Sequence, residues 1–331
     1  MVSKLLIMSN KELYRELCKV EPTIPIFSKD WWLDAVCGKD NWNVVVVERN
    51  SNIIAAMPYY MIRKYGLTVI KMPILTQTMG PWIKYPQNQK YANRISIEKS
   101  LYMEIINRLP NFDYFIQNFN YRVTNWLPFY WRGFNQTTRY TYVIEGLDDI
   151  EEVLSRFKDN MRNKINKARK IITEIQEGNI QDFYDINKKT FERQGIKIPY
   201  SLDLLIEKDN ILSEKNCRKI YFAVDEQHRI HSALYLIWDE LSSYVHMVGE
   251  DPELRKSGAG ILLIYESLKY TKEVLGLDCY DFEGSMIESV EEVRRACGGV
   301  QRPYHSISKT NSRLLKCMQA LSLLKRGICK A

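Results

Sequence analysis

One short stretch of the chain has the residue types and spacing of an anion-binding loop. The run Arg255–Gly260 (RKSGAG) lies between a predicted strand over 244–248 and a predicted helix that begins at Ala259. Glycines at a helix start let backbone N–H groups approach a ligand, and the helix dipole favours negative charge there. A dinucleotide fingerprint is excluded because Leu263 stands at its third glycine, and the Lys-Ser/Thr pair of a P-loop is missing. The loop is therefore a candidate site for a phosphate group of another class of ligand.

A strand–loop–helix–strand unit must position this loop. Gly276 ends the helix, and residues 277–283 form a second apolar run. The two strands of such a unit are parallel neighbours, and open parallel sheets bind ligands at the carboxyl ends of their strands. Glu283 at the end of the second strand is therefore our first candidate for a general base. His246, which titrates near neutrality, and Glu250 are the alternatives.

The pattern Arg255-x-x-Gly258-x-Gly260 resembles the acyl-CoA pyrophosphate loop of the GNAT acyltransferase superfamily. The run 280–285 (YDFEGS), followed by Gly298-Gly299 and Tyr304, resembles the end of its Fem-like branch. That branch includes peptidoglycan bridge-forming aminoacyl transferases and acyl-CoA-dependent relatives.

The resemblance implies acyl-CoA, such as acetyl-CoA, as co-substrate and no metal. It implies backbone N–H donors for the oxyanion at the end of the first strand. Tyr304 is either an acid for the leaving group or a packed aromatic residue. The catalytic candidates are thus Glu283, Tyr304 and His246. The expected cofactor contacts are Met247, Val248, Gly249, Arg255, Lys256, Ser257, Gly258, Ala259 and Gly260.

The order of elements recurs along the chain. Residues 47–57 (VERNSNIIAAM) align with 224–234 (VDEQHRIHSAL), and each reads as a hairpin. A helix and strand at 92–119 then correspond to those at 259–283. We therefore predict an α/β (α+β) fold of tandem duplicated GNAT-like domains, each a mixed, mostly antiparallel sheet with flanking helices. Residues 1–146 form a degenerate N-terminal domain without a cofactor loop, and residues 147–331 form the C-terminal domain that has it.

A basic helix is predicted over 147–172 as the connection between the domains. Its apolar stripe recurs every three or four residues, and Asp148 with Glu151 resembles a capping box. The opposite face carries seven basic residues between Arg156 and Lys170. This face is either a solvated surface or an anion-binding surface for CoA, a phosphorylated acceptor or tRNA; a similar helix in Fem-like proteins favours binding.

Composition sets the remaining limits. With 331 residues, 45% hydrophobic residues and a net charge of +7, the chain suits a globular protein with polyanionic partners. No apolar run approaches the ~20 residues that cross a bilayer, so we expect a cytoplasmic protein. The seven cysteines form no CxxC pair, and His228-x-x-His231 lacks a third ligand, so no metal site is expected. The tail 312–330 is amphipathic and basic; it either packs on the body or lies at the inner face of the membrane.

Three functions compete. The lead is an N-acyltransferase that moves an acyl group from acyl-CoA to a small-molecule or lipid-linked amine on a cell-envelope or polysaccharide precursor. The second keeps the fold but takes aminoacyl-tRNA as donor, as in the bridge-forming relatives. The third is a non-catalytic protein that binds a glycan or an anion on the same scaffold. DNA is not an expected partner in any of them.

Overall fold

The computed structural model describes residues 8–284 and 286–328 and divides into two compact units. One comprises residues 1–139 and 304–331, and the other residues 140–303. The chain leaves the first unit within strand β6 (Asn135–Glu145) and returns to it within β12 (Val300–Thr310). The predicted division at 146/147 lies near the first passage, whereas residues 304–331 group with the first unit and not with the second. Whether the units are independently folding domains stays a prediction.

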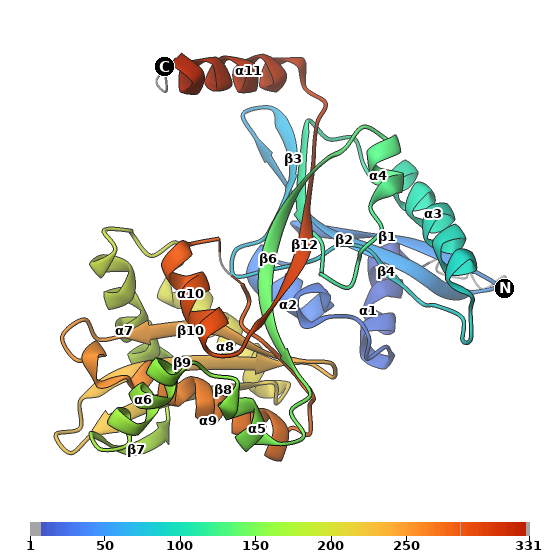
Figure 1. The fold of residues 1–331 in the computed structure, drawn as a ribbon. Coiled ribbons are helices and arrows are strands. Elements are labelled where there is room, and N and C mark those ends of the chain that lie inside the picture. The colour runs from blue at the N-terminus through green and yellow to red at the C-terminus, as the bar shows by residue number, and fades with distance from the viewer. Residues whose placement is uncertain (1–7, 285, 329–331) are drawn as a thin grey trace, which may run out of the picture. The chain divides into compact units, whose positions relative to one another are not determined.

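The first unit is a mixed sheet with helices (Figure 1). Strands β1–β2 and β2–β3 are antiparallel, β3–β5 is parallel, and β5 pairs with β12 antiparallel. Helix α3 connects the two parallel strands, and a phenylalanine-rich core packs beneath it. The elements are α1 (Asn10–Val20), η1 (Ile26–Ser28), α2 (Asp30–Cys37), β1 (Trp42–Arg49), β2 (Asn52–Lys64), β3 (Leu67–Lys71), β4 (Trp82–Ile83), α3 (Tyr91–Arg108), β5 (Tyr114–Asn118), α4 (Leu127–Trp131) and α11 (Arg313–Ile328).

The second unit repeats this topology. Strands β8–β9 and β9–β10 are antiparallel, β10–β11 is parallel with α9 as the crossover, and β11 pairs with β6 antiparallel. Strand β7 extends the sheet beside β8. The elements are α5 (Ile150–Ser155), α6 (Asp159–Ala168), β7 (Ile172–Glu177), α7 (Ile180–Arg193), α8 (Leu202–Glu214), β8 (Arg218–Asp225), β9 (Ile230–Trp238), β10 (Ser243–Glu250), η2 (Arg255–Ser257), α9 (Ala259–Glu273), β11 (Cys279–Asp281) and α10 (Glu288–Ala296).

The predicted duplication and fold class are therefore confirmed. The two hairpins recognised in the sequence are β1–β2 and β8–β9, and each has a bulge beside its turn. In both units a helix then joins two parallel neighbouring strands. In the first unit that helix begins at Tyr91 without a side-chain cap and without glycine in its first turn, whereas α9 of the second unit begins with Ala259 and Gly260.

The prediction of one connecting helix over 147–172 is wrong. The segment forms two helices, α5 and α6, and its last residue, Ile172, already begins β7. The first helix is capped by Asp149, whose carboxylate accepts the amides of Glu151 and Glu152, and not by Asp148. The helix breaks at 156–158 because the amide of Lys158 donates to the carbonyl of Ala296, 2.9 Å away, in another element of the unit. This contact replaces an intrahelical bond.

Helices cover both faces of the second unit's sheet. Side chains alternate along a strand, so successive residues of β9 point to opposite faces. Leu234 and Leu236 belong to the core beneath α9, together with Leu262 and Leu263. Tyr235 instead contacts Phe183 of α7, with ring centroids 5.5 Å apart. The face covered by α7 and α8 is the one that holds the charged side chains described next.

Candidate active site

Strands β10 and β11 run side by side and then separate. They are parallel, as predicted, but pair only at Ser243 with Tyr280 and at Tyr244 with Asp281. Strand β10 continues to Glu250, whereas β11 ends at Asp281. The carboxyl ends of the two strands therefore part within a few residues. This is the place in an open parallel sheet where ligands bind.

Glu283 and His246, both predicted from the sequence, meet at this divergence. The Glu283 Oε1 atom lies 2.7 Å from His246 Nδ1. His246 occupies the bulge between Val245 and Met247, and a bulge turns a side chain away from the regular alternation. Glu283 has a positive φ of 55°, an uncommon conformation for a non-glycine residue, and its amide donates to Asp281 Oδ1 at 2.8 Å. Local backbone geometry thus fixes both side chains.

A third residue, Lys208 of α8, completes the cluster. Its Nζ atom lies 2.6 Å from His246 Nε2, and the residue is only 1% exposed. An ammonium group can only donate, so when Lys208 is charged, Nε2 accepts and Nδ1 carries the proton that is donated to Glu283. The three side chains form one directed chain of hydrogen bonds from Lys208 through His246 to Glu283.

Burial shifts the protonation of all three groups. It raises the pKa of Glu283 well above its usual range, and Asp281 adds to the rise, while Lys208 and Arg294 oppose it. Burial lowers the pKa of Lys208 to about 7. Burial and then the neighbouring Lys208 hold the pKa of His246 well below its usual range, so the imidazole is neutral. A carboxylate with a raised pKa is a suitable proton acceptor near neutral pH.

Lys208 was not among the residues predicted from the sequence, although a signal was present. Helix α8 buries Leu205, Lys208, Asp209 and Leu212, which recur at helical spacing. A lysine and an aspartate at core positions of an amphipathic helix require partners, because burying an unpaired charge is costly. Asp209 accepts from the Tyr235 hydroxyl at 2.7 Å, which supports the helix from the sheet side.

The glycines of the predicted phosphate loop have close neighbours within the protein. Gly258 has a φ of +84°, and a Cβ there would lie 2.6 Å from the carbonyl oxygen of Lys164 in α6. A Cβ on Gly249 would lie 2.8 Å from the amide nitrogen of Asn187 in α7. Both positions therefore need glycine for packing, whatever ligand binds. On α6, Lys167 donates from Nζ to the carbonyl of Lys256 at 2.8 Å and braces the loop.

The residues around the loop fit an anionic group, with one opposing charge. Arg255, Arg193 and Lys164 act on Glu250, lowering its pKa, while burial has the larger effect and raises it. The Glu250 carboxylate lies against the first turn of α9, since a Cβ on Gly260 would be 2.7 Å from its Oε1. Three cations thus act on one carboxylate, and of these Arg255 Nε lies 3.9 Å from Glu250 Oε2. A phosphate bound there would share the cations with Glu250.

The other predicted contacts keep their places in the fold. The carbonyl of Val248 accepts from Asn187 Nδ2 at 2.6 Å, and that of Gly249 accepts from Ser232 Oγ at 3.0 Å. Ser257 Oγ accepts the amide of Ala259 at 3.3 Å. The predicted binding roles of these residues and of Met247 stay predictions.

Tyr304 belongs to the first unit, in contrast to Glu283 and His246. It is buried, and its hydroxyl accepts from Arg139 Nε at 3.3 Å. Its predicted role as an acid stays a prediction.

The predicted basic surface of 156–170 is largely engaged in contacts within the chain. Arg156 pairs with Glu152, Arg162 pairs with Asp159, and Arg169 lies over the ring of Tyr265. At the β8–β9 turn, His231 Nε2 lies 2.9 Å from Asp225 Oδ2. Among the described residues, no group of three or more His, Cys, Asp or Glu side chains could hold a metal ion.

Part of the chain matches a known domain family, and the whole chain is similar in fold to several solved structures. Residues 155–287 match the family model for the acetyltransferase (GNAT) domain. The chain is similar to the crystal structure of FemX, with a TM-score of 0.66 and 12% identity over 90% of this chain and 96% of that chain. It is similar to L-PGS from Bacillus licheniformis, with a TM-score of 0.55 and 11% identity over 95% of each chain. No curated protein matches the chain.

A further similar structure is the C-terminal domain of a putative lysylphosphatidylglycerol synthetase from Agrobacterium fabrum. Its TM-score is 0.54, with 9% identity over 97% of each chain. At such identities the likeness concerns the fold, and it extends over both units of the chain.

Proposed function

Because the chain contains a GNAT acyltransferase domain within a Fem-like fold, we propose that it is an N-acyltransferase whose general base is Glu283. The observation that supports this proposal is the hydrogen-bonded chain Lys208–His246–Glu283 at the diverging ends of β10 and β11. A carboxylate with a raised pKa, aligned by a neutral imidazole, suits the removal of a proton from an attacking amine.

Each residue has a distinct part in the proposed reaction. The amine nitrogen attacks the acyl carbonyl carbon, and Glu283 takes the proton that the nitrogen loses as the C–N bond forms. His246 holds the carboxylate through its Nδ1–H, and the positive charge of Lys208 favours the ionised form of Glu283. Backbone N–H groups at 247–249 are the proposed donors to the oxyanion. Tyr304 is the proposed proton donor to the leaving group.

We propose acyl-CoA as the donor, with Arg255, Arg193, Lys164 and the loop 255–260 as its binding residues. Acyl-CoA supplies the acyl group as a thioester, whose C–S bond breaks as the amide forms. The three cations that act at the start of α9 support an anionic donor. The negative charge of Glu250, which lies against Gly260, opposes the binding of such a donor. The acceptor we propose is an amine on a small or lipid-linked precursor of the cell envelope or a polysaccharide.

An aminoacyl-tRNA donor is the second candidate. Glu250 favours it, because a carboxylate at the start of α9 opposes a pyrophosphate at that position. The name of the similar synthetase from Agrobacterium fabrum, which refers to a lysyl group, also supports an aminoacyl donor.

Acetyl-CoA, other short acyl-CoAs and charged tRNA are offered in turn with a panel of soluble amines, and the amide product is measured by mass spectrometry. We expect product from acyl-CoA and a loss of about 100-fold or more in kcat for Glu283→Gln. Glu273→Gln, an exposed glutamate on α9 of the same unit, is the matched control and should keep full activity. Product from charged tRNA alone would establish the second donor. Turnover that survives in Glu283→Gln and in Tyr304→Phe alike would show that the active site lies elsewhere.

A further inference from the structure

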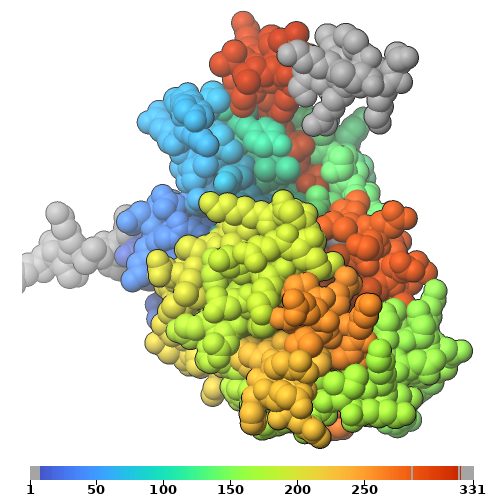
Figure 2. Space-filling view, turned by 90° about the vertical axis from the view of Figure 1, so that its left-hand side faces the viewer, coloured from blue at the N-terminus to red at the C-terminus, as the bar shows by residue number. Residues whose placement is uncertain are grey.

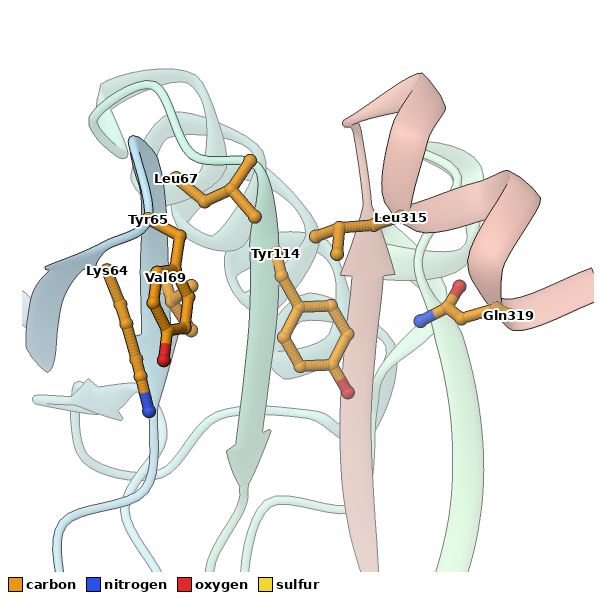
Figure 3. Close-up of a pocket in the computed structure, with 7 residues that line it drawn as sticks. All are labelled: Lys64, Tyr65, Leu67, Val69, Tyr114, Leu315 and Gln319. Carbon is orange, nitrogen blue, oxygen red and sulfur yellow. The ribbon is translucent and has the colours of Figure 1, made fainter. Parts of the chain in front are cut away.

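The C-terminal helix α11 is attached by one side and exposes an apolar stripe on another. Leu315 is half-buried and faces the first unit, where it lies across from Tyr114 (Figure 3). Leu314, Met318 and Leu321 are 62%, 57% and 60% exposed, and Cys317 between them is exposed as well. Their spacing of three and four residues places them on one side of the helix. These four residues form what we call the α11 stripe.

The surroundings of the stripe are also unusual for a solvent-facing surface. Tyr65, at the turn between β2 and β3, is 90% exposed. It lines a recess of about 400 Å³ beside α11. The lining residues are Lys64, Tyr65, Leu67, Val69, Tyr114, Leu315 and Gln319 (Figure 3). Figure 2 shows α11 in red above the light-blue segment that contains the β2–β3 turn. An exposed tyrosine with an apolar body and a polar tip suits a boundary between water and lipid.

The charge of this end of the chain has one sign. Residues 313–331 contain Arg313, Lys316, Lys325, Arg326 and Lys330 and no acidic residue. Arg313 and Lys316 are exposed beside the stripe. Burial, followed by the repulsion of Lys316 and Arg132, lowers the pKa of Lys309. Cations from α11, from β12 and from the residue after α4 therefore lie near one another.

We propose that the α11 stripe binds the surface of an anionic lipid bilayer, with the apolar side chains in the interface and the basic ones at the headgroups. An amphipathic helix with lysine and arginine beside an apolar face associates with membranes in this way. No helix in the described part of the chain is long and apolar enough to cross a bilayer. The inference concerns the first unit and does not depend on the proposed reaction.

Two other occupants fit the same surface less well. RNA would use the cations, but its phosphates give no role to three exposed apolar side chains. A second copy of this chain could cover the stripe, but it would bring two segments without any acidic residue into contact, and like charges repel.

The test is sedimentation of the full chain with vesicles of phosphatidylcholine alone and with about one third phosphatidylglycerol. We expect at least tenfold stronger binding to the anionic vesicles, weakened by salt. The variant Leu314→Ser/Met318→Ser/Leu321→Ser should reduce that binding at least tenfold. The control Val20→Ser/Ile196→Ser/Val274→Ser removes residues that are 78%, 51% and 63% exposed elsewhere, and it should bind as the unchanged protein does. Thermal unfolding of each variant verifies that the fold is kept.

The charge is tested separately. Arg313→Gln and Lys316→Gln should each weaken binding to anionic vesicles about fivefold at low ionic strength. Equal binding to neutral and anionic vesicles, or unchanged binding of the stripe variant, would overturn the proposal. So would a dimer in light scattering that the stripe variant dissociates, or RNA binding without vesicle binding. Activity on a soluble amine without vesicles should be the same in the stripe variant, which keeps this test apart from that of the proposed reaction.

Discussion

Replacing Lys208 with methionine should move the pH dependence of catalysis in one direction. The substitution keeps an unbranched side chain that is one atom shorter, and it removes the charge. Lys208 lowers the pKa of Glu283 through its positive charge, against the larger opposite effect of burial. Without that charge, the ionised carboxylate is less favoured, and the pKa of Glu283 rises. The active base therefore appears only at higher pH, and the ascending limb of kcat/KM against pH moves upward.

The size of the effect follows from the geometry. Two hydrogen bonds of 2.6 and 2.7 Å join Lys208 to Glu283 across one imidazole ring. This arrangement puts the two charges within about 7 Å of each other, where they attract by about 2 kcal/mol at an effective dielectric constant of about 20. An energy of that size corresponds to about 1.5 pH units in the limb and to a loss of about 10- to 30-fold in rate below the limb. Because the pKa of Lys208 is itself lowered to about 7, the two enzymes should converge at higher pH.

The assay is kcat/KM with a soluble amine over the range from about pH 5 to 9. Lys215→Met, an exposed lysine that follows the same helix, is the matched control and should leave the profile unchanged. A substitution that merely loosened the fold would reduce activity by the same factor at every pH and would lower Tm. A uniform loss, or a limb that moves to lower pH, would refute the role given to Lys208.

The loop supplies two further predictions. Gly258→Ala should destabilise the protein more than Gly276→Ala in chemical unfolding, because both have positive φ but only Gly258 has a backbone oxygen, that of Lys164, 2.6 Å from the added Cβ. The φ cost shared by both is about 1–2 kcal/mol, and equal losses would mean that the close approach to α6 is relieved without cost. Glu250→Gln should tighten acyl-CoA binding several-fold in calorimetry, because the carboxylate against the first turn of α9 repels a phosphate. Weaker binding in that variant would place the phosphates elsewhere.

Local patterns in the sequence were enough to predict the repeated unit and its loop. The alternation in residues 244–248, the glycines near Ala259 and the helical spacing after it gave β10, α9 and the parallel β11, because each depends on neighbours within a few positions. The same patterns failed over 147–172, where a single helix was expected. There the helix is broken by a tertiary hydrogen bond from the amide of Lys158 to the carbonyl of Ala296. A contact between residues so far apart in the chain does not show in local sequence patterns.

For the candidate site, the sequence by itself determined Glu283 and His246 as candidates, because a strand end in a parallel sheet and a titratable residue nearby can be recognised from order alone. Only the tertiary structure decided that Lys208, 38 residues before His246, completes the cluster. It also decided that position 258 requires glycine, because the carbonyl oxygen of Lys164 lies too close for a Cβ, and that Glu250 lies where a phosphate was expected. The physical reason is that burial, and with it the pKa of every group in the cluster, arises when distant segments pack and remove water from charges.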